Sequence, residues 1–214
     1  MESNNTTYCD DVKIMQKTIK IYNNLLIEIV IEEAAEYKND NRKYTWNEIV
    51  GGGAIAHSDA FFMQLEALSI EIQKHCDIHK PISISINFSS DDEIKALNKE
   101  YRAKDKPTNA LSFPANYQNH AIMEQWNIKE PVRHAGDIII ALETIINESK
   151  KQNKAIEHHM IHLVLHSILH LFGYDHINDE DRMQMEAIEV GILKKLSIPD
   201  PYVEIISRED AHTT

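Results

Sequence analysis

The sequence predicts a single α/β (α+β) domain in which a small mixed sheet of four strands packs with about five helices. Two observations support this prediction: strand and helix patterns alternate along the chain, and 214 residues suit one domain. Hydrophobic residues make up 43% and charged residues 26%, which is ordinary for a folded soluble protein. We expect a loose N-terminal extension (1–24), the domain itself (25–202) and a frayed polar tail (203–214).

Strand patterns occur in separate parts of the chain. Residues 25–31 are rich in leucine, isoleucine and valine, as in a buried strand. Residues 81–88 alternate apolar and polar side chains, which predicts a half-buried strand. Shorter strands are expected at 110–113 and 137–141, with a polar loop at 115–134 between them.

Helices are predicted where apolar residues recur at helical spacing. The expected segments are 59–76, 91–102, a helix that ends near 151, 155–172 and 179–196. Ser90 and Asp91 suit the start of the second segment, because short polar side chains cap free N–H groups. Gly173 suits the end of the histidine-rich segment 155–172.

Charge and cysteine content narrow the class of protein. Lys and Arg number 22 and Asp and Glu 34, which gives a net charge of −12. This charge argues against extensive non-specific binding to nucleic acid and allows only a local basic patch. Cys9 and Cys76 have no CxxC spacing, which rules out a disulfide framework and suits a reducing compartment. No segment has the pattern of a signal peptide or a membrane span. We expect a cytoplasmic protein without membrane contact.

The most informative pattern is HxxxHxxGxxH. His166 and His170 are four residues apart, so on a helix their imidazoles lie one turn apart on the same face. Gly173 can end that helix in a left-handed turn, which lets the chain bring His176 back toward the pair. Three imidazoles leave one tetrahedral position open, as in a catalytic zinc site. A structural histidine-rich helix is the alternative, but it does not explain the glycine.

The residue after the first histidine limits the chemistry. Zinc peptidases with this spacing carry glutamate there as the general base, whereas this chain has Ser167. A site without a carboxylate ligand also keeps the full +2 charge of its ion. We therefore expect an anionic substrate, and a phosphodiester fits better than a peptide.

Further motifs accompany the histidines over roughly residues 80–202. They read HLVLHSILHLFGYDH at 162–176, LNKEYRAKDKPTNALSFP at 97–114, GDI at 136–138 and DPY at 200–202. In this order they resemble the YbeY family of bacterial rRNA maturation factors. One departure is Ser167, where the family usually has glycine.

The resemblance implies a single-strand-specific, metal-dependent endoribonuclease that acts in rRNA maturation, at the 3′ end of 16S rRNA, and in ribosome quality control. It assigns one metal ion per chain, expected to be zinc, to His166, His170 and His176, and a catalytic role to Arg102. Its implied partners are single-stranded rRNA, the small ribosomal subunit and ribosomal proteins.

Other residues near these motifs are candidates for supporting roles. Lys104 and Lys106 lie in a locally basic segment of an acidic chain, as substrate-binding residues would. His162 lies one helical turn before the first ligand and could contact substrate or a ligand. Asp175 could orient an imidazole through a hydrogen bond or shape the turn. His159 is expected at the surface.

Two other functions stay open. One is a non-catalytic, metal-stabilised ribosome assembly factor, because an acidic protein suits contact with ribosomal proteins. The other is a zinc peptidase, which Ser167 disfavours. Nickel or cobalt would also satisfy three imidazoles, because affinity alone does not select zinc.

Overall fold

The computed structural model describes the chain in segments. The backbone is described for residues 3–9, 12–20, 24–32, 37–39, 42–44, 56–115 and 132–203, and the side chains within 24–29, 61–115 and 132–203. The part of the predicted loop at 116–131 and the tail at 204–214 lie outside the described residues.

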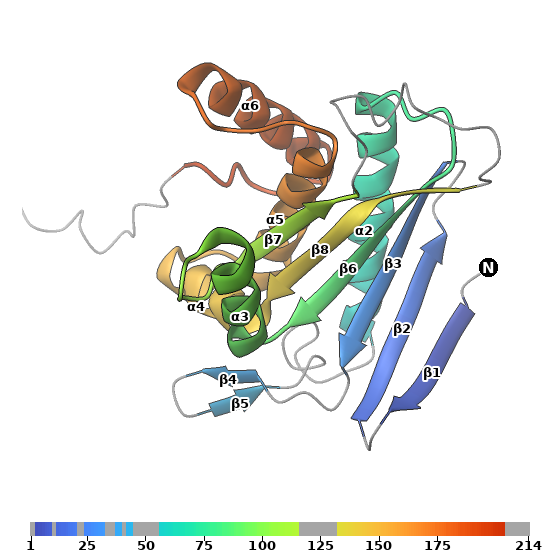
Figure 1. Cartoon of the computed structure of the whole chain (residues 1–214). Helices are drawn as coiled ribbons and strands as arrows, with labels where there is room; N and C mark the ends of the chain where they lie inside the picture. Colours follow the sequence, from blue (N-terminus) through green and yellow to red (C-terminus); the bar gives the residue numbers. More distant parts are fainter. Residues whose placement is uncertain are drawn as a thin grey trace, which may run out of the picture.

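A mixed six-stranded sheet forms the centre of the fold (Figure 1). Its strand order is β1-β2-β3-β6-β8-β7, in which β3, β6 and β8 are parallel and the remaining neighbours are antiparallel. The strands are β1 (Ser3–Cys9), β2 (Val12–Lys20), β3 (Leu25–Glu32), β6 (Ile82–Ser89), β7 (Ala110–Pro114) and β8 (Arg133–Ala141). A separate hairpin pairs β4 (Tyr37–Asn39) with β5 (Arg42–Tyr44).

The α/β fold class is confirmed, and β3, β6, β7 and β8 are the four predicted strands. The two additional strands come from residues 3–20, in the segment that the sequence predicted as loose. They form a hairpin whose second strand pairs with the edge of β3. Backbone pairing to an open strand edge gives little signal in local side-chain patterning, which explains why it was not predicted.

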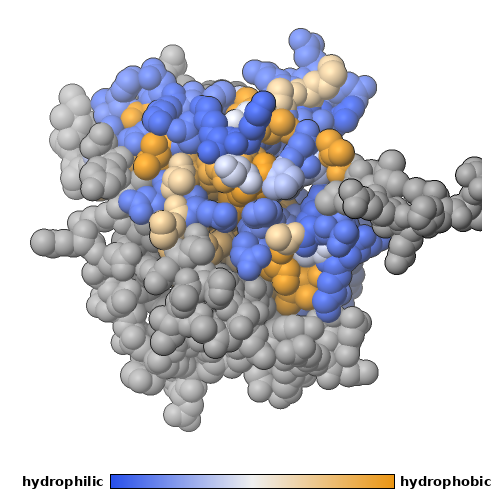
Figure 2. Space-filling model, turned by 180° about the vertical axis from the view of Figure 1, so that it is seen from behind, coloured by the Kyte–Doolittle hydropathy of each residue, from blue (hydrophilic) through white to orange (hydrophobic). Residues whose placement is uncertain are grey.

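The helices follow the predicted order. They are α2 (Ala56–His75), α3 (Asp91–Arg102), α4 (Leu142–Lys151), α5 (Ile156–Leu171) and α6 (Asp179–Lys195). In Figure 1, α2 and α5 lie behind the sheet and α3 lies in front of it. Viewed from behind, the described part of the helical face is largely hydrophilic with small hydrophobic patches (Figure 2). None of the helices in the described residues combines the length and apolar character that crossing a bilayer requires.

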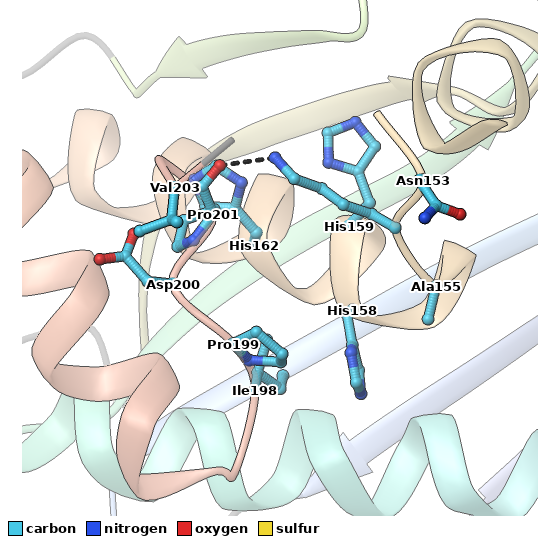
Figure 3. Close-up of a pocket in the computed structure, with 11 residues that line it drawn as sticks. Asn153, Ala155, His158, His159, His162, Ile198, Pro199, Asp200, Pro201 and Val203 are labelled. Atoms are coloured by element: carbon cyan, nitrogen blue, oxygen red, sulfur yellow. Dashed lines mark hydrogen bonds between the residues drawn. The ribbon is translucent and has the colours of Figure 1, made fainter. Parts of the chain in front are cut away.

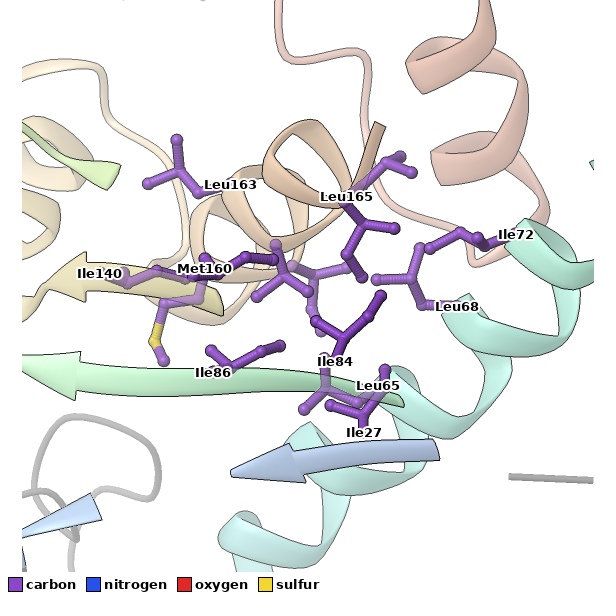
Figure 4. Packing of buried hydrophobic residues seen from close by; sticks show 14 of the residues in the cluster. Ile27, Leu65, Leu68, Ile72, Ile84, Ile86, Ile140, Met160, Leu163 and Leu165 are labelled. Atoms are coloured by element: carbon purple, nitrogen blue, oxygen red, sulfur yellow. The ribbon is translucent and has the colours of Figure 1, made fainter. Parts of the chain in front are cut away.

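The main core lies between the sheet and the helices behind it. Figure 4 shows where side chains of α2 and α5 meet those of the strands. The labelled residues include Ile27, Leu65, Leu68, Ile84, Ile86, Ile140, Met160 and Leu165, all at 0% exposure. Burial of this many aliphatic side chains, at about 1.5–3 kcal/mol each, accounts for much of the folding free energy. A smaller cluster around Ile94 and Leu111 packs α3 against the other face of β7 and β8.

Helix α3 has defined ends, which fixes the position of Arg102 in its last turn. The Ser90 side chain accepts a hydrogen bond from the backbone N–H of Glu93, as predicted for a cap. The Glu93 carboxylate in turn accepts a hydrogen bond from the Ser89 hydroxyl. At the other end Ala103 adopts a left-handed conformation (φ 55°) and its N–H bonds to the carbonyl of Lys99.

Candidate metal centre

Three histidines gather at the end of α5 and in the turn that follows it. His166 and His170 lie one turn apart on α5, and His176 comes from the turn before α6. Their ligand nitrogens all lie within 4.8 Å of one another. The ring centroids of His166 and His170 are 4.6 Å apart, and those of His170 and His176 are 5.0 Å apart. The structure therefore brings together the residues that the spacing selected.

The turn after α5 has the hydrogen bonds of a Schellman motif. The N–H of Gly173 bonds to the carbonyl of His170 at 3.0 Å, and the N–H of Tyr174 to that of Leu169 at 3.1 Å. Gly173 has φ +88°, a conformation that residues with a Cβ rarely adopt. The reversed chain then presents the Tyr174 carbonyl to Nδ1 of His170 at 2.9 Å. The same turn therefore orients one imidazole and delivers the third.

The donor set of the three imidazoles fits a shared cation. The Nδ1–H of His170 donates to a carbonyl, and the Nδ1–H of His166 donates to Oε1 of Glu189 at 2.8 Å. A neutral imidazole that donates from Nδ1 carries its lone pair on Nε2. The two Nε2 atoms lie 3.1 Å apart, close enough for both to bind the same cation. Burial, with His166 nearby, lowers the pKa of His170, which favours the neutral form that binds metal.

A buried carboxylate lies directly behind the histidines. Glu189 of α6 is 0% exposed, and its Oε2 accepts hydrogen bonds from Nε2 of His162 at 3.0 Å and from the Tyr202 hydroxyl. Burial raises the pKa of Glu189, but the hydrogen bonds from His162, His166 and Tyr202 outweigh it and bring the pKa down to about 2. An ionised carboxylate on the second nitrogen of a ligand histidine fixes the ring and increases its basicity.

Sequence reasoning did not select Glu189, although a local signal was present. Its neighbours on the same face of α6 include Met185, Ile192 and Leu193, which are buried. A carboxylate within an apolar helical stripe is costly to bury without hydrogen-bond donors. The pattern predicts burial with partners, but it does not say which partners these are.

A cavity of about 490 Å³ opens beside the three histidines. Its lining includes Arg102, Ser112 and Ser167, which come from α3, β7 and α5. The Ser112 hydroxyl donates to the carbonyl of Ser167 at 3.2 Å and so joins β7 to α5. Arg102 is exposed and has no hydrogen-bond or ion-pair partner among the described residues. Its guanidinium therefore remains available at the cavity.

Strand β7, which lines this cavity through Ser112 and Pro114, lies very close to β8. Gly136 of β8 has φ +147°, and a Cβ there would lie 2.4 Å from the backbone oxygen of Phe113 and 2.9 Å from Cδ2 of Leu171. Glycine is therefore required where β8 passes β7 and α5. This contact belongs to the GDI motif at 136–138.

The remaining predicted residues lie around the cavity in different ways. Lys104 and Lys106 are exposed in the turn after α3 and do not line it. Asp175 lines it, and its Oδ1 accepts the backbone N–H of His176 at 2.8 Å, so it shapes the turn; among the described residues it has no hydrogen bond to an imidazole. His162 faces away from the cavity and has only 13% of its side chain exposed.

His162 instead lines a second cavity of about 410 Å³, between α5 and residues 198–203 (Figure 3). His159, which also lines it, is buried, so the prediction of a surface position was wrong. Its Nε2 bonds to Oε2 of Glu148 at 2.8 Å, because α4 packs beside α5.

Known proteins have sequences similar to a large part of this chain, which includes the metal centre. A family model described as Endoribonuclease YbeY matches residues 55–197. Endoribonuclease YbeY of Bradyrhizobium diazoefficiens is 44% identical over 121 residues, which is 56% of this chain and 64% of that protein. The match therefore spans just under two thirds of that relative's length. Endoribonuclease YbeY of Colwellia psychrerythraea is 42% identical over 126 residues, 59% of this chain and 76% of that protein. The solution structure of TM1509 from Thermotoga maritima has a TM-score of 0.44 at 23% identity, covering 69% of this chain and 93% of that chain.

Proposed function

The chain belongs to the endoribonuclease YbeY family, as its motifs predicted, and on this premise we propose that it is a zinc-dependent endoribonuclease that cleaves single-stranded rRNA. The observation that carries the proposal is the convergence of three imidazole nitrogens within 4.8 Å beside Arg102, which has no ion-pair partner in the described part of the chain. We extend it to maturation of the 3′ end of 16S rRNA and to ribosome quality control, in the cytoplasm, with the small ribosomal subunit and its proteins as partners.

His166, His170 and His176 would hold the ion. A zinc ion bound by three neutral ligands keeps its full charge and supplies Lewis-acid chemistry toward water and phosphate oxygens. The protein holds two of the rings in their metal-binding tautomer through Glu189 and the carbonyl of Tyr174. No carboxylate stands among the three ligands, which suits an anionic substrate.

Arg102 would bind the phosphodiester. Its planar guanidinium can donate two parallel hydrogen bonds to phosphate oxygens, and with the described residues it has no ion pair to break. As charge builds on the phosphate during cleavage, the same donors stabilise it. Lys104 and Lys106 extend the positive charge beyond the cavity, where they would contact neighbouring phosphates.

The test compares purified variants on a fluorescent single-stranded RNA. We expect His166→Ala to abolish cleavage and Arg102→Ala to slow it by about 100-fold or more. His158→Ala, on the same helix, and Arg182→Ala, an exposed arginine paired with Asp179, serve as matched controls and should cleave normally. Equal residual cleavage by all proteins would identify a contaminant and refute the proposal.

Two further measurements define the reaction. Elemental analysis of the native protein should find about one zinc per chain, and the triple variant of the three histidines should lose it. An RNA with a single 2′-deoxy nucleotide at the cut site distinguishes attack by water from attack by the 2′-hydroxyl. Continued cleavage of that RNA would exclude the 2′-hydroxyl as nucleophile.

A non-catalytic assembly factor is the second candidate function, favoured by the net charge of −12. It predicts that metal-loaded protein binds small ribosomal subunits but leaves single-stranded RNA intact. Cleavage that depends on both His166 and Arg102 would exclude it.

A further inference from the structure

Tyr202 connects the C-terminal segment of the domain to the metal centre without lying in it. Its hydroxyl donates to Oε2 of Glu189, whose Oε1 accepts from His166. The Tyr202 ring also packs edge-on against His162, at 5.6 Å between centroids. Neither Tyr202 nor Glu189 lines the cavity beside the three histidines. Tyr202 therefore reaches the ligand His166 only indirectly, through the Glu189 carboxylate and through His162, whose ring lies 6.3 Å from that of His166.

The two carboxylate oxygens are used unequally. Oε1 has His166 as its hydrogen-bond partner, whereas Oε2 has both His162 and Tyr202. Two donors on Oε2 hold that oxygen in place, and because the carboxylate is rigid they also determine where Oε1 points. Without the Tyr202 hydroxyl, His162 alone would hold Oε2, and the group could rotate about its terminal bond.

The hydroxyl is not needed to attach the segment. Ile198 is 5% exposed and belongs to the main core. The Lys154 ammonium donates to the carbonyl of Pro201 at 2.5 Å, the bond drawn in Figure 3. These contacts, with the ring of Tyr202 on His162, fasten residues 198–202 independently of the bond to Glu189. A structural role for the segment therefore leaves the hydroxyl itself unexplained.

We propose that Tyr202 is a positioning residue for the metal centre: through Glu189 it fixes the ring of His166 and so sets the affinity for the metal ion. The proposal rests on the proposed function only in that the three histidines bind metal, and it is tested by metal binding without RNA.

The experiment measures zinc affinity by competition with a chromogenic chelator at pH 7. Glu189→Gln should weaken binding by about 10- to 100-fold, as is typical when the partner of a metal-bound histidine is removed. Tyr202→Phe, which keeps the ring and loses the hydroxyl, should weaken it less, by about 3- to 10-fold. Tyr101→Phe is the control, because Tyr101 is 62% exposed and packs on Phe113, away from Glu189.

The double variant separates positioning from a general loss of stability. If Tyr202 acts through Glu189, then Tyr202→Phe should cause no further loss of zinc affinity in the Glu189→Gln background. The visible spectrum of bound Co²⁺ should change in Tyr202→Phe and stay unchanged in Tyr101→Phe, since it reports the ligand geometry. Urea unfolding of the metal-free proteins shows that each variant is folded under the conditions of the titration.

The outcomes are distinguishable. Tight zinc binding by wild type with an equal affinity in Tyr202→Phe would overturn the inference and leave the proposed function intact. Full additivity in the double variant would also overturn it, because Tyr202 would then act independently of Glu189. If the wild type binds zinc no more tightly than His166→Ala does, both proposals are refuted.

Discussion

Replacement of Glu189 by glutamine should make the protein less stable at neutral pH and less sensitive to acid. The side chain is completely buried, and its charged form accepts hydrogen bonds from His162, His166 and Tyr202. Glutamine has nearly the same shape but carries no charge and replaces one acceptor oxygen by a donor group. The variant therefore removes the charge and one acceptor while it keeps the shape of the side chain.

The magnitude follows from the pKa of Glu189, which is lowered from 4.5 to about 2. Each unit corresponds to about 1.4 kcal/mol, so the charged form contributes about 3 kcal/mol to the free energy of unfolding. Because the pKa is lower in the folded than in the unfolded chain, this contribution is fully present above pH 4.5 and is lost as the pH falls from 4.5 toward about 2. At about pH 3.5 roughly 1 kcal/mol of it should be gone.

The assay is urea unfolding of metal-free protein, followed by circular dichroism from pH 7 to pH 3.5. The quantity of interest is the difference in unfolding free energy between wild type and Glu189→Gln at each pH, in which the titration of distant groups cancels. Glu180→Gln, at an exposed position in the first turn of α6, is the control and should stay within about 0.5 kcal/mol of wild type. A difference that is constant over this range would refute the reasoning, as would one that grows with acidity.

Three further predictions follow from the same structure. Gly136→Ala should lower the unfolding free energy by about 3 kcal/mol or more, since its Cβ would lie 2.4 Å from a backbone oxygen and the residue has φ +147°. The control Gly191→Ala, whose Cβ would meet open space, should be neutral or stabilising by about 0.5–1 kcal/mol. Equal changes in unfolding free energy for the two variants would contradict the steric argument. Burial raises the pKa of Cys76 to about 11, so iodoacetamide at pH 8 should label the Cys76 peptide at least 10-fold more slowly in folded than in urea-unfolded protein by mass spectrometry; equal rates would show an accessible thiol. Lys104→Ala and Lys106→Ala should each reduce the slope of log affinity against log salt concentration for single-stranded RNA by about 0.7, measured by fluorescence anisotropy. An unchanged slope would show that these lysines do not contact the RNA.

The local features of the site were predictable because they depend on neighbours in the sequence. The spacing of His166 and His170 fixes their relative position on any helix, and Gly173 marks the turn that delivers His176. The helix cap at Ser90 and the alternating strand at 82–88 are equally local. Each of these depends on backbone geometry repeated over a few residues, so a short window of sequence contains the information.

Contacts between distant elements were not predictable in the same way. Glu189 reaches His166 only because α6 packs on α5, and Tyr202 reaches Glu189 only after the chain turns back at the end of α6. The pairing of residues 12–20 with β3 is of the same kind.

The sequence by itself determined the helices and four of the strands, the family, and the three imidazoles that can share an ion. The tertiary structure decided which further groups support those imidazoles: the carboxylate of Glu189 and the hydroxyl of Tyr202. The reason is physical, since hydrophobic periodicity shows which face of an element is buried but not which neighbour will cover it. A polar side chain on such a face finds its partners only when the elements pack together.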